Sequence, residues 1–471
     1  MFNRFFYSQT KTITLAAGIL AMSYLISAIL GLIRDGLLIS KFGASSELDV
    51  YFAAFRIPDF VYQILILGGL IVAFLPLFSE YFSRQKNEAW EMTNYVLNGF
   101  LFFLISISLI LFIFTPWLIK LIFPGFGPGE IKLAIPLTRL LFLSPIFFGI
   151  SNLLSGILQY FNRFFIYSLT PILYNLGIIF GILFLAPKFG IFGVGMGVIF
   201  GAFLHLTIQI PSAINCGFSY KFLFDLKYPA IKRIFQLMIP RVFGIAAQQI
   251  NLIFFTAIAS MMGIGAITIF NFSNNLQSLP IGLIGVSFAV AIFPALSRAW
   301  AEKKKDHFIK IFSSVFRQIL FLIIPISLLI LIFRTEIIKI VVEIGRVILG
   351  RSQFGQMEIN LAATCLGIFS FSIFAQSLIP FLSRAFFSFQ DTKTPTLITI
   401  TSVALSITLA FSFTQLLTFP NLFHNFIENS FGLREVENLA VIGLPLAFSI
   451  AAIFQFILLY FLFRRKIKKL L

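Results

Sequence analysis

Long, almost uncharged apolar runs follow one another along nearly the whole chain. Twelve of them are long enough to cross a bilayer as helices, since about 20 helical residues span roughly 30 Å of hydrocarbon. The runs are continuously apolar rather than alternating, which disfavours transmembrane strands. They cover residues 13–39, 50–78, 94–118, 131–159, 165–186, 190–215, 230–259, 266–297, 308–333, 358–388, 395–418 and 439–463. With 59% hydrophobic and 11% charged residues, the composition is not that of a soluble protein. We predict an all-α polytopic membrane protein with about twelve transmembrane helices.

The distribution of positive charge orients these spans. With the amino terminus in the cytoplasm, 22 of the 35 lysines and arginines fall on inner loops and ends, 10 on outer ones, and 3 in or beside spans. This asymmetry follows the positive-inside rule, so we predict that both termini are cytoplasmic. The net charge of +17 then reflects contact with phospholipid and not with nucleic acid. Arg4 and Lys11 precede a run that continues to Ile39, which predicts a retained helix rather than a signal peptide.

Two groups of residues recur at nearly one interval. The stretch from Arg384 to Pro395 is echoed 221 residues earlier, from Arg163 to Pro171. A second group, offset by 218 residues, pairs Ala73, Pro76 and Ser79 with Ala291, Pro294 and Ser297. We therefore predict two six-helix lobes, residues 1–220 and 221–471. Such parallel repeats are related by a pseudo-two-fold axis along the membrane normal, and their substrate site lies between them.

Ionisable residues inside spans are candidates for function because charge in hydrocarbon is costly. Arg34 and Asp35 come near the end of the first span. Successive helical residues do not face each other, so we expect each of the two to need another partner. Gly31 and Gly36 flank them and predict a bent or locally broken helix that turns the pair toward a cavity. The alternative is an interfacial anchor at the outer boundary.

Asp49 and Arg56 open the second span, seven residues apart and so on one helical face. With Arg34 they could hold an anionic headgroup, since guanidinium groups suit phosphate. The alternative is an internal ion-pair network that seals the outer end. Further along lie Arg241 and Gln248 in the seventh span and Asn274 and Asn275 in the eighth. These predict a hydrated polar lumen, with hydrogen bonding between helices as the competing explanation.

The chain carries no catalytic or nucleotide-binding motif. Its three histidines, His205, His307 and His424, do not form a set, and the two cysteines, Cys216 and Cys365, lie far apart in apolar runs. A metal site or a disulfide framework is therefore not indicated. We expect neither a cofactor nor an enzymatic reaction.

Several segments, each weak alone, share their order and spacing with one family. They are Gly31 to Asp35, Phe42-Gly43, Asp49, Ala53 to Pro58, Ala73 to Pro76, Asn162 to Phe164, Pro171, Asn175, Gly285-Val286, Pro294, Ser297, Glu343 to Gly345 and Asp391 to Pro395. Together they resemble the MurJ (MviN) family, lipid II flippases of the multidrug/oligosaccharidyl-lipid/polysaccharide exporter superfamily. The resemblance covers nearly the whole chain.

The resemblance implies a transporter of the bacterial cytoplasmic membrane that moves a polyprenyl-diphosphate-linked peptidoglycan precursor to the outer leaflet by alternating access. It also implies that wall-synthesis enzymes are partners. By the family pattern, Arg34 is a cavity arginine, Asp35 and Asp49 are the matched carboxylates, and Arg56 stands where the family has a basic residue. Membrane potential or a counter-ion would reset the cycle.

Two departures from the family pattern concern the cargo. Ala28, Tyr62 and Asn275 stand where family members commonly carry cavity arginines, and the family usually has two further helices bordering a groove for the lipid tail. The alternatives are a flippase for another polyprenyl-linked oligosaccharide and a drug-cation antiporter. Two further alternatives are not transporters. A glycosyltransferase would need ordered acidic groups in an outer loop, and a non-transporting scaffold would need no cavity charges.

Overall fold

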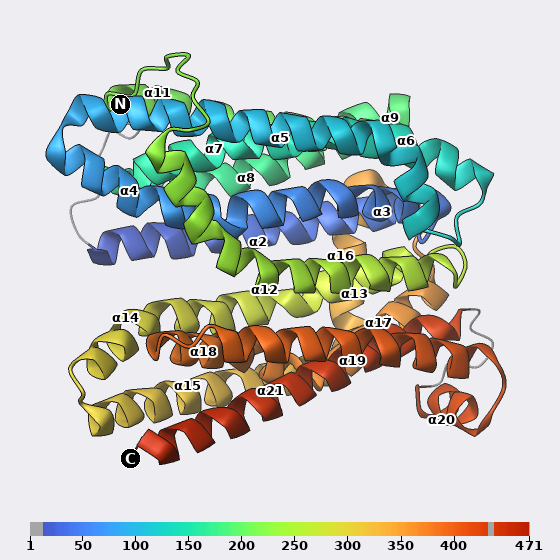
Figure 1. Ribbon diagram of the computed structural model, residues 1–471. Coiled ribbons are helices and arrows are strands. Elements are labelled where there is room, and N and C mark those ends of the chain that lie inside the picture. The colour runs from blue at the N-terminus through green and yellow to red at the C-terminus, as the bar shows by residue number, and fades with distance from the viewer. Residues whose placement is uncertain (1–12, 432–437, 471) are drawn as a thin grey trace. The chain divides into compact units, whose positions relative to one another are not determined.

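The computed structural model describes residues 13–431 and 438–470, and every regular element within those ranges is helical (Figure 1). Arg4 and Lys11 lie outside these ranges. The α-helices are α2 (Ile13–Phe42), α3 (Ser46–Val61), α4 (Ile71–Arg84), α5 (Lys86–Ile122), α6 (Pro128–Leu141), α7 (Leu143–Tyr160), α8 (Phe164–Phe180), α9 (Ala186–Phe189), α10 (Ile191–Thr207), α11 (Ile210–Asn215), α12 (Pro229–Ser260), α13 (Ala266–Pro280), α14 (Ser287–Ala301), α15 (Lys305–Ile332), α16 (Arg334–Leu349), α17 (Gln356–Ser370), α18 (Ile373–Ser388), α19 (Lys393–Thr418), α20 (Leu422–Phe431) and α21 (Gly443–Leu470). Three π-helical segments, η1 (Tyr62–Leu70), η2 (Gly181–Leu185) and η3 (Ile281–Val286), and one 3₁₀ turn, η4 (Leu439–Ile442), complete the set.

The helices confirm the predicted class of polytopic membrane protein. Within the described ranges, nine helices are long and apolar enough to cross a bilayer, or ten if α17 and α18, bent by 45° at their junction, count as one span. Helices occupy all twelve predicted segments. Two predicted segments are outside this count: the α3–η1–α4 stretch, and α12, of which Gly244–Ser260 is a shorter apolar helix. The number twelve therefore stays a prediction.

The chain divides into two compact units. Unit 1 comprises residues 1–38 and 46–250, and unit 2 comprises residues 39–45 and 251–471. The end of α2 thus belongs to unit 2, where the Gln353 amide donates to the Ser40 carbonyl at 2.8 Å. The predicted division into residues 1–220 and 221–471 stays a prediction, because the units follow packing and not span number.

Each unit contains an aromatic cluster at the turn between two of its helices. In unit 1, Phe78, Phe82 and Trp90 at the α4–α5 turn pack on Tyr160 and Phe161 at the end of α7. In unit 2, the corresponding contacts join Trp300 and Phe308 at the α14–α15 turn to Phe389 after α18. Aromatic pairs at these distances are worth about 1 kcal/mol each beyond burial. The same packing thus recurs at equivalent places in the order of helices.

The π-helical segments recur in a similar way. Segment η1 interrupts the helix that contains Pro76, and η3 interrupts the helix that contains Pro294. Shifting η1 by the 218 residues that separate these prolines gives residues 280–288, which include all of η3. π-Helical segments are rare in proteins, and those that occur are often found at functional sites.

Glycine brings α8 and η2 against α10 in unit 1. An added Cβ at Gly197 would lie 2.6 Å from the Gly181 Cα, and one at Gly201 would lie 2.5 Å from the Tyr174 carbonyl oxygen. Side chains would therefore hold these helices apart. Small residues are the usual means of close helix packing in lipid, where water does not drive apolar surfaces together.

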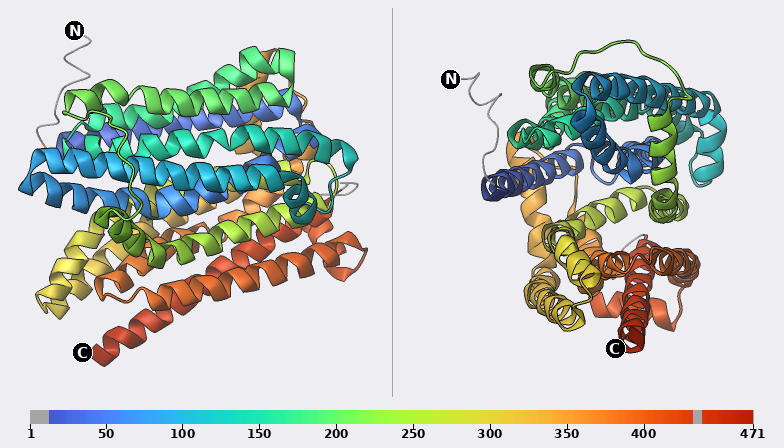
Figure 2. Two further views of the ribbon diagram at one scale, coloured as in Figure 1. Left: turned by 45° about the horizontal axis from the view of Figure 1, so that its top comes forward. Right: turned by 60° about the vertical axis from the view of Figure 1, so that its left-hand side comes forward.

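The polar stretch Arg384 to Pro395 joins α18 to α19 in a helical hairpin, whose turn is formed by residues 389–392. The Asp391 carboxylate accepts a bond from the Thr394 amide at 3.0 Å and from the Lys466 Nζ on α21 at 2.6 Å. Burial favours the neutral form of this carboxyl, yet the hydrogen bonds from Lys466 and Thr394 outweigh it and lower the pKa of Asp391. In both views of Figure 2, α19 and α21 lie side by side, so this pair links the hairpin to the last helix.

Gly197→Val should destabilise unit 1, because its side chain would collide with the backbone at Gly181. Overpacking of this kind costs about 1–3 kcal/mol. The measurement is the apparent melting temperature of the purified protein in detergent. Gly18→Val is the matched control, since an added Cβ at Gly18 meets no atom within 4 Å. Equal melting temperatures for the two variants would contradict the close approach.

Lys466→Met should lower stability at neutral pH by about 1 kcal/mol, because the Asp391 carboxylate loses a charge-assisted bond. The lowered pKa of Asp391 means that this stabilisation is present at neutral pH and is lost as the pH falls through that pKa. The variant and the parent should therefore converge once the pH is below that pKa, which lies under the ordinary value of 3.8. Melting curves at several pH values measure this, with exposed Lys468→Met as the control. A deficit that persists unchanged in acid would exclude the ion pair as its cause.

Candidate functional site

The ionic centre of unit 1 is built on Arg34 of α2. Its guanidinium contacts Asp35, with Nε donating to Oδ1 at 2.9 Å and Nη2 at 2.8 Å from the same oxygen. The expectation that these neighbours are poorly placed to neutralise each other was wrong, because the long arginine side chain bends back over one residue. Nη1 also donates to Asn175 Oδ1 of α8 at 2.9 Å, so the predicted further partner exists. The arginine side chain is 23% exposed.

Asn175 fixes this arrangement from the opposite side. It is buried, and its Nδ2 donates to Ser27 Oγ at 3.1 Å and to the Pro171 carbonyl at 3.2 Å. An amide held by its own donors presents its oxygen to Arg34 at a defined position. Helix α2 continues without interruption from Ile13 to Phe42, so the predicted local break near Gly31 and Gly36 was wrong. The pair is turned by hydrogen bonds to α8 and not by a broken backbone.

Aromatic hydroxyls and a second pair of charges extend the ionic centre. Tyr51 and Tyr174 lie within electrostatic range of Arg34. Arg56 and Asp59, three residues apart on α3, interact with each other. We call the set Arg34, Asp35, Tyr51, Arg56, Asp59, Tyr174 and Asn175 the unit 1 polar centre. It places charges of both signs, with phenol groups, inside an otherwise apolar bundle.

Asp49 lies near the start of α3, and Tyr62 directly follows its last residue. Asp49 is buried in the first turn, where a carboxylate is favoured by the helix dipole. Tyr62 begins η1, hydrogen bonds with Asn152 and packs on Phe148 at 4.9 Å between ring centroids. A tyrosine with these neighbours fills the place at which the resemblance led us to expect an arginine.

The other predicted residues lie on α12 and α13. Gln248 is exposed in the part of α12 that belongs to unit 1. The backbone of Arg241 lies in the same part, and its side chain is outside the described structure. Asn274 and Asn275 are half-buried on α13 in unit 2. Of the predicted residues, Arg34, Asp35 and Arg56 thus belong to the unit 1 polar centre. Asp49 lies in the first turn of α3, and Gln248, Asn274 and Asn275 lie on α12 and α13.

Amides of unit 2 form a chain of hydrogen bonds between helices. Gln277 donates to Asn274 Oδ1 at 2.9 Å and accepts from Gln376 of α18 at 2.8 Å. Gln376 also donates to Ser372 Oγ at 2.9 Å, which in turn donates to Ser449 of α21 at 3.0 Å. The bond between α13 and α18 is made by Gln277, whereas Asn274 accepts its bond within α13. For Asn274 and Asn275 the choice between a polar lumen and hydrogen bonding between helices stays a prediction.

His205 is likewise satisfied within its own unit, as expected. Its Nδ1 lies 2.6 Å from Ser151 Oγ, and Gln209 donates to the same hydroxyl. Both cysteines are free thiols. Among the residues that the structure describes, no group of three His, Cys, Asp or Glu side chains could hold a metal ion.

Two features of the site were not predicted from the sequence: the tyrosines Tyr51 and Tyr174 near Arg34, and the role of Asn175 in positioning Arg34. Tyr51 and Tyr174 sit among many aromatic residues, and nothing in their spacing marks them. Asn175 did carry a signal, a single amide in an apolar span four residues after Pro171. With this spacing, the Asn175 side-chain amide donates to the carbonyl of Pro171, four residues earlier on the same helix.

The chain is similar in sequence to proteins of one known family. The model of the family described as lipid II flippase MurJ matches residues 38–470. The lipid II flippase MurJ of Burkholderia cenocepacia is 26% identical over 385 residues, covering 80% of this chain and 73% of the relative. The probable lipid II flippase MurJ of Buchnera aphidicola subsp. Schizaphis graminum is 29% identical over 441 residues, covering 93% and 80%.

Solved structures give the same result. A structure described as lipid II flippase MurJ in an inward closed conformation aligns with a TM-score of 0.75 and 25% identity over 96% of this chain and 89% of its own. An inward-facing MATE family transporter aligns with a TM-score of 0.74 and 16% identity, over 96% and 98%, which shows a shared fold alone. Since the family match extends from the last turns of α2 to the end of α21, the chain belongs to the lipid II flippase MurJ family.

Proposed function

We propose that this protein moves lipid II, a polyprenyl-diphosphate-linked glycan, from the inner to the outer leaflet of the bacterial cytoplasmic membrane. The family match over residues 38–470 carries this proposal. The two similar proteins described above are named lipid II flippase and probable lipid II flippase. Flipping needs no covalent step, so binding, reorientation and release account for the whole reaction.

The proposed binding site includes Arg34, Asp35, Asp49, Arg56, Arg241, Gln248, Asn274 and Asn275. Arg34 is the principal anion-binding group, because its guanidinium is held in place by Asp35 and Asn175 yet remains partly exposed. A fixed guanidinium suits the oxygens of a diphosphate. The two lobes, residues 1–220 and 221–471, would alternate in opening the site to either side. The excess of positive charge on the inner loops supports a cytoplasmic position for both termini.

The ion pair favours this proposal over a drug-cation antiporter. In unit 1 the Asp35 carboxylate already accepts two contacts from Arg34. A cation would have to displace a guanidinium that is also bonded to Asn175. An anionic cargo instead approaches the arginine, which gains a second negative partner without losing the first. A flippase for another polyprenyl-linked oligosaccharide uses the same diphosphate chemistry and differs in the glycan.

Further partners are expected because flipping lies between the synthesis of lipid II and its polymerisation. A flippase receives lipid II from the enzymes that build it at the inner face and delivers it to polymerising enzymes at the outer face. We therefore propose wall-synthesis enzymes as partners, in addition to the surrounding phospholipid.

Supplying this chain to a bacterium depleted of its own lipid II flippase should restore outer-leaflet lipid II. The measurement is the amount of lipid II accessible to an enzyme added outside the cytoplasmic membrane. Arg34→Ala should reduce the signal more than about tenfold, because a charge-assisted contact to the diphosphate is lost. Exposed Arg317→Ala on α15 is the matched control. A well-expressed parent chain that restores nothing would refute the proposed cargo.

Asn175→Leu should impair flipping through Arg34, because the guanidinium loses the acceptor that positions it. Asn175→Asp keeps an oxygen acceptor for Arg34 and should retain most activity. Since Asn175 also bonds to Ser27, both variants are compared for melting temperature as well as for flipping. If the two variants lose activity in proportion to their loss of stability, Asn175 has a structural role only.

A further inference from the structure

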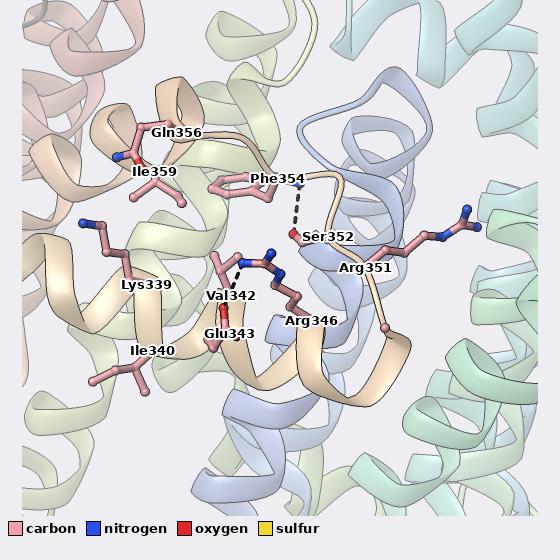
Figure 3. Close-up of a pocket in the computed structure, with 11 residues that line it drawn as sticks. Lys339, Ile340, Val342, Glu343, Arg346, Arg351, Ser352, Phe354, Gln356 and Ile359 are labelled. Atoms are coloured by element: carbon pink, nitrogen blue, oxygen red, sulfur yellow. Dashed lines mark hydrogen bonds and ion pairs between the residues drawn. The ribbon is translucent and has the colours of Figure 1, made fainter.

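A cavity of about 690 Å³ lies in unit 2 between α16, the segment 350–355 and the start of α17 (Figure 3). Its floor is apolar and formed by Val342, Phe354 and Ile359, which are buried. Its rim is polar and includes Lys339, Glu343, Arg346, Arg351 and Gln356. The transport site proposed above uses none of these residues.

The rim carries more positive than negative charge. Three cations, Lys339, Arg346 and Arg351, face one carboxylate, Glu343, whose Oε2 is 3.5 Å from Arg346 Nη1. Within residues 13–431 and 438–470, Lys339 and Arg351 form no ion pair. In Figure 3, Arg351 points away from the other labelled side chains. Lys339 and Arg346 are seven residues apart, two turns on one helical face, and remain to attract an anion.

Helix α16 has a second apolar face that no described side chain covers. Ile338, Val341, Val342 and Gly345 form its buried face. On another side, Ile340 is 60% exposed and Val347 is 73% exposed. This apolar face adjoins the charged stripe, a pattern typical of helices that lie in the interface of a membrane.

The position of α16 in the chain supports a membrane interface. Helix α15 is one of the candidate spans and ends at Ile332, and α16 begins two residues later at Arg334. The connection is too short to carry α16 far from the boundary of the hydrocarbon. Figure 1 shows α16 running across the direction of the neighbouring long helices of unit 2. Its exposed apolar face can therefore meet lipid.

From these observations we propose that the cavity binds an anionic glycerophospholipid. Lys339 and Arg346 hold the phosphate, and the acyl chains cover Ile340 and Val347. Ile340 both lines the cavity and is exposed beside it, so a single amphipathic molecule reaches both surfaces. A free phosphate would use the cations and leave Ile340 uncovered. The cation excess favours a lipid with net negative charge over a zwitterionic one.

The test measures lipid binding to the purified full-length protein by native mass spectrometry in detergent. The probes are phosphatidylglycerol, phosphatidylcholine and inorganic phosphate. The parent protein should retain phosphatidylglycerol in preference to phosphatidylcholine. Lys339→Gln/Arg346→Gln should weaken phosphatidylglycerol binding about thirtyfold, since both cations that hold the phosphate are lost. Single Lys339→Gln, at an exposed residue outside any ion pair in the described ranges, provides a variant that keeps the fold.

The matched control is Lys310→Gln/Arg317→Gln on α15. It removes the same two residue types, also seven apart and also exposed, at a place without this cavity. Phosphatidylglycerol binding should be unchanged in the control. Equal losses in both double variants would overturn the proposal, as would equal retention of the two lipids by the parent. Competition by inorganic phosphate as strong as that by phosphatidylglycerol would identify a site for free anions and reject the lipid.

Discussion

In hydrocarbon, every backbone amide and carbonyl must find its partner within the protein, and the rest of this structure depends on that constraint. An unsatisfied group there costs several kcal/mol, so each crossing is a helix. Many side-chain hydroxyls are satisfied in the same way, as Thr115, Thr256 and Ser327 show by bonding back to the carbonyl four residues earlier. Glycines then allow the satisfied backbones to pack closely, as at Gly181 and Gly197.

Within that apolar framework, the two units differ in how they place polar groups. Unit 1 contains charges, with Arg34 and Asp35 paired and Arg56 beside Asp59. In unit 2, a chain of neutral amides and hydroxyls on α13, α18 and α21 is bonded together, and the charged pair of Lys466 with Asp391 lies at the turn before α19. The two units therefore differ in the chemistry of these polar groups. The guanidinium groups of unit 1 suit an anion better than the neutral amides of unit 2 do.

The fold could be predicted further from the sequence than the site. Apolar length and continuity decided the helical class, and the hairpin at Asp391 followed from its polar stretch and Pro395. The pairing of Arg34 with Asp35 was mispredicted, because helical spacing describes Cβ positions and not the reach of a long side chain. The roles of Tyr51 and Tyr174 depend on contacts between helices distant in sequence. On α13, Gln277 bonds across to α18 while Asn274 bonds within its own helix, so composition alone does not separate a polar lumen from hydrogen bonding between helices.

The π-helical segments change which residues of a span can be assigned to its lipid-facing and interior sides. In η1 and η3 each turn contains more residues than an α-helical turn, so the angle between successive side chains is smaller. Residues after η1 therefore face directions that a constant period of 3.6 would not assign. A helical wheel drawn through residues 46–84 places α3 correctly and rotates α4 out of phase. Lipid-facing and interior positions of this span have to be assigned in two separate registers.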